Sequence, residues 1–250
     1  MNLMNVPLLV LAFSCMLLWL AAEIGAGFRS RATPLKEDER DDFGLVLSST
    51  LTLLGLLIGF SFSMGLSRYD QRKDYEEAEA NAIGTEYVRV ELLPPEAASK
   101  TRRLLKEYLQ ERVLFYQTGD ASRLADINRR TGELQNALWT AVVPSVAAEP
   151  TNPMALVMSG MNDVLNSQGY TQAAWLNRIP IAAWGLMALV ACSCNFLVGY
   201  RARRKDWRIF VILPITVSIA FFLISDLDSP NGGGIRVAPQ NLLLLSRSLQ

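Results

Sequence analysis

Residues 45–66 read LVLSSTLTLLGLLIGFSFSMGL, and after Ser67 the chain continues as RYDQRKDYEEAEANAIGTEYVRVELL over residues 68–93. No proline interrupts this stretch before Pro94, so it predicts one helix about 70 Å long at about 1.5 Å per residue. The first half is apolar enough to lie in a bilayer, whereas the second half is charged and belongs in water. The stretch therefore predicts a membrane span that continues into an aqueous domain.

The membrane half of this helix has one face of small and weakly polar residues. At 100° per residue the stripe consists of Ser48, Thr52, Gly55, Gly59 and Ser63, and it is bordered by Leu56 and Phe60. Small residues let two helices approach closely in a bilayer. The same stripe can also line a narrow, poorly wetted pore. Helix packing is the simpler interpretation, and both stay open on the sequence alone.

The composition points to a membrane protein. Half of the 250 residues are apolar and the mean hydropathy is +0.19. Apolar runs cover residues 6–26, 45–66, 179–200 and 209–224. These runs predict an all-α fold with four spans and a helical-bundle aqueous domain inserted between the second and third. We divide the chain into residues 1–66 (first two spans), 67–178 (aqueous domain) and 179–250 (last two spans and a tail).

Within the aqueous domain, apolar residues recur at helical spacing. They predict helices over residues 96–117, 121–143 and about 153–167, with breaks at Pro94-Pro95, Gly119, Pro144 and Gly169. Before the second span, Asp41 and Asp42 are candidates for capping the helix N-terminus. No stretch alternates with a period of two residues, so we expect no sheet.

The residue types exclude most catalytic chemistry. The chain has no histidine, which removes histidine acid–base catalysis and every histidine-ligated metal site. It has no Gly-rich phosphate loop and no CxxC motif, and Cys15, Cys192 and Cys194 all lie in apolar runs. Asn195 and the two later cysteines form no recognisable acid–base set for an intramembrane enzyme. We therefore predict no enzyme, no cofactor and, since the net charge is zero, no nucleic-acid partner.

The charges of the links between spans predict the orientation. The short links 29–42 and 199–208 hold nine Lys and Arg residues, and both must lie on the same side of the membrane. The positive-inside rule places these links in the cytoplasm and the helical domain and both termini outside. The N-terminus has no basic residue, so we expect the first span to be retained rather than cleaved.

The motifs GFSFSMGLSRYDQRKDYEEAEANAIGTEYVRVELLP and DLDSPNGGGIRV resemble those of the bestrophin-like membrane proteins of bacteria and plants, a family of unknown activity. A more distant similarity to bestrophin channels rests on Gly59-Phe60 followed by Arg68-Tyr69. Bestrophins are pentamers whose second span lines the pore. Their helical domain is cytosolic, which is the reverse of the orientation that the charge count predicts for this chain.

The resemblance implies an oligomeric, pentameric ion channel in a bacterial inner membrane. Carried over by position, the apolar neck of the pore falls on Thr52, Leu56 and Phe60, of which Thr52 departs from the bulky apolar type. Together with Gly59 and Ser63 these are the candidate pore and gate residues. The charged continuation of the helix predicts a vestibule lined by Arg68, Asp70, Arg72, Lys73, Asp74, Glu76, Glu77 and Glu79. Because these charges are of both signs, they do not indicate whether the channel selects cations or anions.

A second hypothesis is a membrane sensor or scaffold whose helical domain binds a ligand or a partner protein. A closed ring of subunits would favour the channel, and a monomer or dimer would favour the sensor. For either function we predict a polar network that holds the long helix against the last two spans, formed by Glu79, Asn81, Arg178, Asp226 and Asp228. The simpler alternatives are that each of these groups is separately solvated, and that Asp226 and Asp228 cap a hydrated helix end. Two aspartates are too few for a calcium site of their own.

Overall fold

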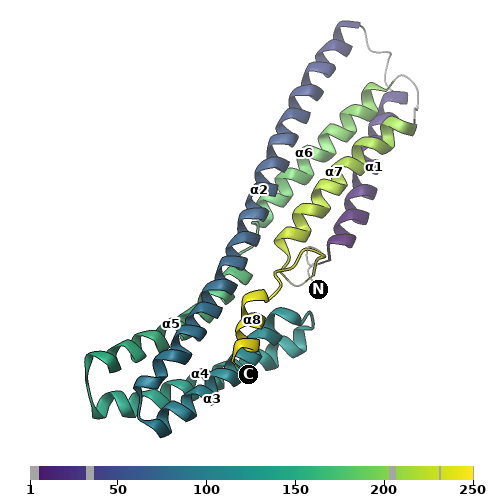
Figure 1. Ribbon diagram of the computed structural model, residues 1–250. Helices are drawn as coiled ribbons and strands as arrows, with labels where there is room; N and C mark the ends of the chain where they lie inside the picture. The colour runs from purple at the N-terminus through teal and green to yellow at the C-terminus, as the bar shows by residue number, and fades with distance from the viewer. Residues whose placement is uncertain (1–5, 32–36, 203–206, 231, 250) are drawn as a thin grey trace. The chain divides into compact units, whose positions relative to one another are not determined.

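The computed structural model describes residues 6–31, 37–202, 207–230 and 232–249, and within these ranges it is helical with no strand. The elements are α1 (Pro7–Arg31), α2 (Glu37–Arg89), the short 3₁₀ turn η2 (Val90–Leu92), α3 (Pro95–Gln117), α4 (Ala121–Ala148), α5 (Asn152–Leu176), α6 (Ile181–Arg201), α7 (Trp207–Asp228) and α8 (Gln240–Ser248) (Figure 1). Four helical stretches are long and apolar enough to cross a membrane. The predicted all-α, four-span fold is confirmed, and the chain is an integral membrane protein.

The long helix predicted over residues 45–93 forms without interruption. α2 has 53 residues, and the chain leaves it through η2 just before Pro94. At 1.5 Å per residue it is about 80 Å long. It begins at Glu37, about two turns earlier than predicted, so Asp41 and Asp42 lie inside its second turn and do not cap it.

The chain divides into two compact units, and α2 contributes residues to both. The membrane unit comprises Met1–Tyr69 and Arg178–Arg236, and the aqueous unit comprises Asp70–Asn177 and Val237–Gln250. These limits lie close to the predicted ones at residues 66 and 178. The C-terminal segment differs, because it belongs to the aqueous unit rather than to the last two spans.

The membrane unit is built on the contacts of α1 with α6 and α7, which run side by side in Figure 1. The buried residues of α1 recur every three or four positions along one face: Pro7, Val10, Ser14, Leu18, Ala22 and Gly25. Two glycines permit backbone contact between α1 and α6. A Cβ atom on Gly25 would lie 2.1 Å from the carbonyl oxygen of Phe196, and one on Gly199 would lie 1.9 Å from that of Ala22. Close approach of this kind is how small residues stabilise helix pairs in a bilayer.

The aqueous unit packs α3, α4, α5, α8 and the second half of α2 around a core that includes Ile83, Leu105, Leu109, Leu138 and Met161. Local signals set several helix starts. Pro95 occupies the first turn of α3, where its missing N–H costs nothing. Asp120 caps α4 by accepting a hydrogen bond from the Ser122 amide at 2.9 Å.

Two predicted helix ends are wrong, and one helix was not predicted. α4 continues through Pro144 to Ala148, because the buried residues Ala141 and Val142 anchor the preceding turn while Pro144 itself stays exposed. α5 continues through Gly169, because Thr171, Ala174 and Trp175 are buried beyond it. A glycine costs a helix about 1 kcal/mol, which such packing readily outweighs. α8 has only nine residues and gave no signal of its own.

The two short basic links meet at one end of the membrane unit. Arg40 of α2 donates a hydrogen bond from Nη2 to the carbonyl oxygen of Arg201, the last residue of α6, at 3.1 Å. Arg29 and Arg31 lie in the last turn of α1. Residues 32–36, with the predicted break at Pro34, and residues 203–206 of the basic cluster lie outside the described residues, as do residues 1–5 of the N-terminus.

Candidate functional site

One face of α2 packs inside the membrane unit. Along this face Leu54 and Ser61 are buried, and a Cβ atom on Gly65 would lie 3.4 Å from the Cβ of Leu227. Leu47, Leu51 and Ile58 pack partly against the same core. These positions recur every three or four residues, so α2 is held by a single narrow stripe.

The predicted pore residues lie on the opposite face of α2. At 100° per residue, the stripe of Thr52, Leu56, Gly59, Phe60 and Ser63 is centred about 180° from the packing stripe. All five residues are exposed, with Leu56 at 52% and Phe60 at 68%. A Cβ atom on Gly59 would meet nothing within 4 Å. Among the residues that the structure describes, therefore, none packs against this small-residue stripe.

The hydroxyl groups on this face are turned back onto their own helix. Thr52 donates from Oγ1 to the carbonyl oxygen of Ser48 at 2.9 Å, and Ser48 donates from Oγ to that of Leu45 at 2.9 Å. Each hydroxyl oxygen keeps a free lone pair, so the surface is only weakly polar. Leu56 and Phe60 are the bulky side chains of this stripe.

The predicted vestibule charges separate into two groups. Asp70, Lys73, Asp74 and Glu77 are exposed and stay candidates, and Arg68 is partly buried beside Asp228. Arg72, Glu76 and Glu79 are buried within the aqueous unit, so their assignment to a vestibule lining is wrong. A charge that is buried in a folded domain requires partners there, and for both glutamates the structure shows them.

Glu79 lies at the centre of a buried polar cluster. Its Oε1 accepts a hydrogen bond from Nε of Arg112 at 2.5 Å, and its Oε2 accepts from Tyr116 and Thr171 at 3.5 and 3.3 Å. Neither charged side chain has measurable exposure. Burial, followed by the negative charge of Glu79, raises the pKa of Tyr116 above its ordinary range. The cluster therefore ties α2 to α3 and α5 inside the aqueous unit.

Glu76 binds the C-terminal helix. Its Oε2 accepts from the side-chain amide of Asn241 at 2.7 Å, and its Oε1 accepts from the backbone N–H of Leu242 at 3.0 Å. Leu242 is fully buried. A carboxylate that receives backbone N–H groups in the first turn of a helix also interacts favourably with the helix dipole.

The predicted polar network forms only in part. Asp228 accepts from Arg68 at 3.5 Å and from the Ile179 amide at 3.0 Å. Burial lowers the pKa of Arg178, and the charge of Asp228 partly counteracts this shift. Glu79 instead bonds to Arg112, and Asn81 is exposed.

Asp226 closes the glycine-rich turn that follows α7. Its carboxylate accepts from the amides of Gly234 and Ile235 at 2.7 and 2.9 Å. A Cβ atom on Gly233 would lie 2.1 Å from Oδ1 of Asp226, so only glycine fits there. Asp226 and Asp228 are both buried, so the alternative of a hydrated helix end does not describe them. No group of three His, Cys, Asp or Glu side chains suitable for a metal occurs in the described ranges.

Sequence reasoning missed Glu86, which is fully buried on α2. A Cβ atom on Gly160 of α5 would lie 1.9 Å from its Oε2 and 2.5 Å from Nη1 of Arg89. Its oxygens have no hydrogen-bond partner among the residues that the structure describes. Burial raises the pKa of Glu86 to about 8, with Arg89 opposing the shift and Asp163 adding to it. The sequence did contain a signal for its burial, because Glu86 lies at helical spacing from Ile83 and Val90 on the buried face of α2.

The comparisons with known proteins agree with this architecture. A family model described as a bestrophin-like domain matches residues 8–242, so the chain belongs to the bestrophin-like family. No curated protein sequence matches the chain.

Among solved structures, a bacterial bestrophin homologue from Klebsiella pneumoniae matches with a TM-score of 0.65 at 13% identity, covering 95% of this chain and 96% of that one. A mutant of a bacterial bestrophin homologue from the same organism matches with a TM-score of 0.64 at 14% identity and the same coverage. At these identities the matches establish a shared fold.

Proposed function

We propose that this protein is an oligomeric ion channel in which copies of α2 surround an axial pore. The observation that carries the proposal is the exposure of the whole Thr52-to-Ser63 stripe on the face opposite the packing stripe of α2. No residue that the structure describes covers this face, and we assign it to a water-filled lumen that neighbouring copies of α2 enclose. Membership of the bestrophin-like family supports the same arrangement, with a pentamer as the expected ring.

In this proposal Leu56 and Phe60 form the constriction. Both side chains are more than half exposed and lie one helical turn apart. Rings of apolar side chains block ions by excluding water from a narrow lumen, and a side-chain rotation can restore the water column. Thr52 and Ser63 flank the constriction with hydroxyl groups, and Asp70, Lys73, Asp74 and Glu77 are the exposed charges left as candidate vestibule residues.

The first test is the number of subunits. Native mass spectrometry of the purified protein in mild detergent should show a closed ring of four or more copies. A monomer or a dimer would overturn the pore and favour a sensor or scaffold acting through the aqueous unit.

The second test is the constriction itself. In planar bilayers, Phe60→Ala should raise the unitary conductance several-fold, because it removes the bulkiest apolar group of the stripe. Phe62→Ala is the matched control. Phe62 is an exposed phenylalanine of the same helix, about 100° from the centre of the stripe, and its loss should leave the conductance unchanged. Equal effects of the two variants, or none from either, would contradict the gate.

We further propose that the protein lies in the bacterial inner membrane with both short links in the cytoplasm. Basic residues at the ends of α1 and α6, where Arg40 meets Arg201, support this orientation through the positive-inside rule. Labelling of single cysteines at Ser30 and Asn81 in intact cells tests it. A membrane-impermeant maleimide should label position 81 and spare position 30, and the reverse pattern would invert the topology.

A further inference from the structure

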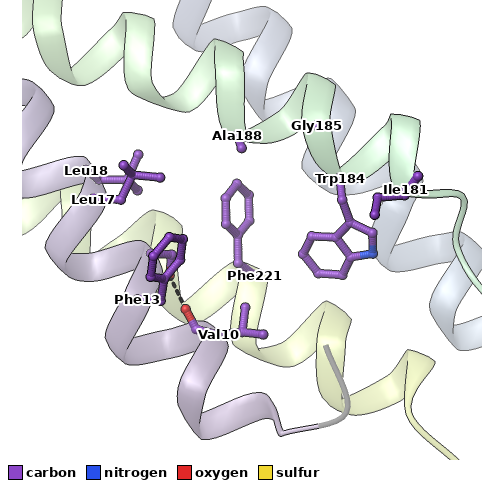
Figure 2. Close-up of a pocket in the computed structure, with 10 residues that line it drawn as sticks. Val10, Phe13, Leu17, Leu18, Ile181, Trp184, Gly185, Ala188 and Phe221 are labelled. Carbon is purple, nitrogen blue, oxygen red and sulfur yellow. Dashed lines mark hydrogen bonds between the residues drawn. The ribbon is translucent and has the colours of Figure 1, made fainter. Parts of the chain in front are cut away.

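The membrane unit contains an apolar cavity among α1, α6 and α7, none of whose lining residues comes from α2. Its volume is about 280 Å³. Figure 2 shows Val10 and Phe13 of α1, Trp184 of α6 and Phe221 of α7 around this space. An apolar cavity of about 150 Å³ already holds a small hydrocarbon and stays free of water. The cavity is therefore large enough for a segment of a hydrocarbon chain.

The cavity opens at the surface of the membrane unit. Phe13 is 48% exposed and Leu17 is 38% exposed, whereas Phe221 and Trp184 at its inner side are 4% and 7% exposed. Gly185 lines the opening, and a Cβ atom there would meet nothing within 4 Å. An occupant could therefore enter from the bilayer and reach buried side chains.

The positions of the lining residues along their helices indicate how deep the cavity lies in the bilayer. Val10 lies three residues from the start of α1, and Trp184 lies three residues from the start of α6, which is about 5 Å at 1.5 Å per residue. Phe221 lies seven residues before the end of α7, or about 10 Å. Leu18, which also lines the cavity, lies eleven residues from the start of α1, or about 16 Å. The cavity thus extends from the outer part of one leaflet, close to the level at which acyl chains join their ester groups, toward the middle of the bilayer.

The lining offers one unpaired polar group. Ser14 is satisfied, because its Oγ donates to the carbonyl oxygen of Val10 at 2.6 Å. The indole Nε1–H of Trp184 is buried with no partner among the residues that the structure describes. In Figure 2 the nitrogen edge of this ring is turned toward Ile181, which is 77% exposed. A buried indole N–H ordinarily has an acceptor, and an ester carbonyl at this depth would supply one.

From these observations we propose that the cavity binds one acyl chain of a bilayer phospholipid, with its ester carbonyl accepting a hydrogen bond from Trp184. The bilayer surrounds these helices and supplies hydrocarbon at this depth. The apolar lining and the single donor, on the side of the cavity where Ile181 is exposed, match an acyl chain and its ester carbonyl. This site is separate from the face of α2 and does not depend on whether that face conducts ions.

Photolabelling in liposomes tests the proposal. The protein is reconstituted with phosphatidylethanolamine that carries a diazirine on one acyl chain, irradiated, and mapped by tandem mass spectrometry. Adducts should form on Phe221, which lies at the inner side of the cavity. Ile224 is equally buried on the same helix but does not line the cavity, so it should remain unlabelled. Equal labelling of both residues, or of neither, would overturn the site.

Two variants close the cavity. Gly185→Phe places a ring in the open space, and Ala188→Leu does so with a smaller group should the first fail to fold. Either should reduce adducts on Phe221 about tenfold. Gly27→Phe is the matched control, because Gly27 of α1 also has open space at its Cβ position and does not line the cavity. Undiminished labelling in folded Gly185→Phe or Ala188→Leu protein would refute the lipid site.

Discussion

Small residues at helical spacing occur in two regions of the membrane unit, and their surroundings are opposite. At the crossing of α1 and α6, an added Cβ atom on Gly25 or Gly199 would lie about 2 Å from a backbone oxygen of the facing helix, at 2.1 and 1.9 Å. On α2, an added Cβ atom on Gly55 or Gly59 would meet nothing within 4 Å. The same pattern therefore serves a packed crossing in one region and a free face in the other. What separates the two is whether the chain supplies a partner helix.

The largest loss of folded protein should come from replacing a glycine at the crossing of α1 and α6 with a larger residue. Gly199→Leu would force α1 and α6 apart, and we expect no monodisperse protein after detergent extraction, measured by size-exclusion chromatography. Gly59→Leu makes the same chemical change on the free face of α2 and should leave the fold of a single chain intact. Loss of folded protein in both variants would show that the α2 stripe is also a packing surface. The contrast between the packed crossing and the free face would then be wrong.

The second largest effect should separate buried from exposed charged residues on α2 by the stability that each contributes. Glu79→Ala leaves Arg112 buried without its carboxylate, and breaking a buried ion pair costs about 3–5 kcal/mol. Glu77→Ala removes an exposed charge two positions earlier and should change the free energy of unfolding by less than about 0.5 kcal/mol. Thermal and urea unfolding followed by circular dichroism measures both. Similar losses would mean that burial does not distinguish these two positions.

The smallest expected effect is the change of stability with pH that Glu86 causes. Its pKa is about 8 in the folded protein against an ordinary 4.5, so between these values the folded state binds more protons than the unfolded state. Stability should therefore fall as pH rises from about 4.5 to 8 and level off above that range. We expect the melting temperature to fall by a few degrees over this range, and Glu86→Gln should remove most of that fall.

Glu77→Gln serves as the control for the pH experiment, because Glu77 is exposed on the same helix. It should reproduce the pH dependence of the wild type. A wild-type melting temperature that stays flat or rises from pH 5 to pH 8 would contradict the buried, protonated carboxyl group.

Much of the fold could be predicted because the signals were long and continuous. The apolar runs located four spans, and the absence of proline up to Pro94 predicted α2 as a single helix. Pro144 and Gly169 were wrongly taken as helix ends. Burial of Ala141 and Val142 before Pro144, and of residues on both sides of Gly169, outweighs the local cost of each. Helix α8 is anchored by Glu76 from far along the chain, and no local pattern carries that information.

The charges of α2 show where sequence reasoning reached its limit. Residues 70–79 alternate between exposed and buried positions with the period of the helix, so Glu77 lies in solvent and Glu76 and Glu79 lie in the interior. Charge is usually taken to indicate exposure, and three of the predicted vestibule residues were misplaced for that reason. The apolar stripe of Ala80, Ile83 and Val90 marks the buried face, and Glu79 and Glu86 lie on that same face.

The link between Glu76 and α8 has a consequence for how the protein is made. The carboxylate receives its partners from residues 165 and 166 positions later in the chain. Asn241 and Leu242 follow α6 and α7 in the chain, so they leave the ribosome only after both of these helices have done so. The aqueous unit therefore cannot complete its fold until the last two spans have left the ribosome. Until then the Glu76 carboxylate and the apolar residues that bury Leu242 remain exposed. Long-range closure of this kind folds slowly, so this unit is where a nascent chain would most need protection from aggregation.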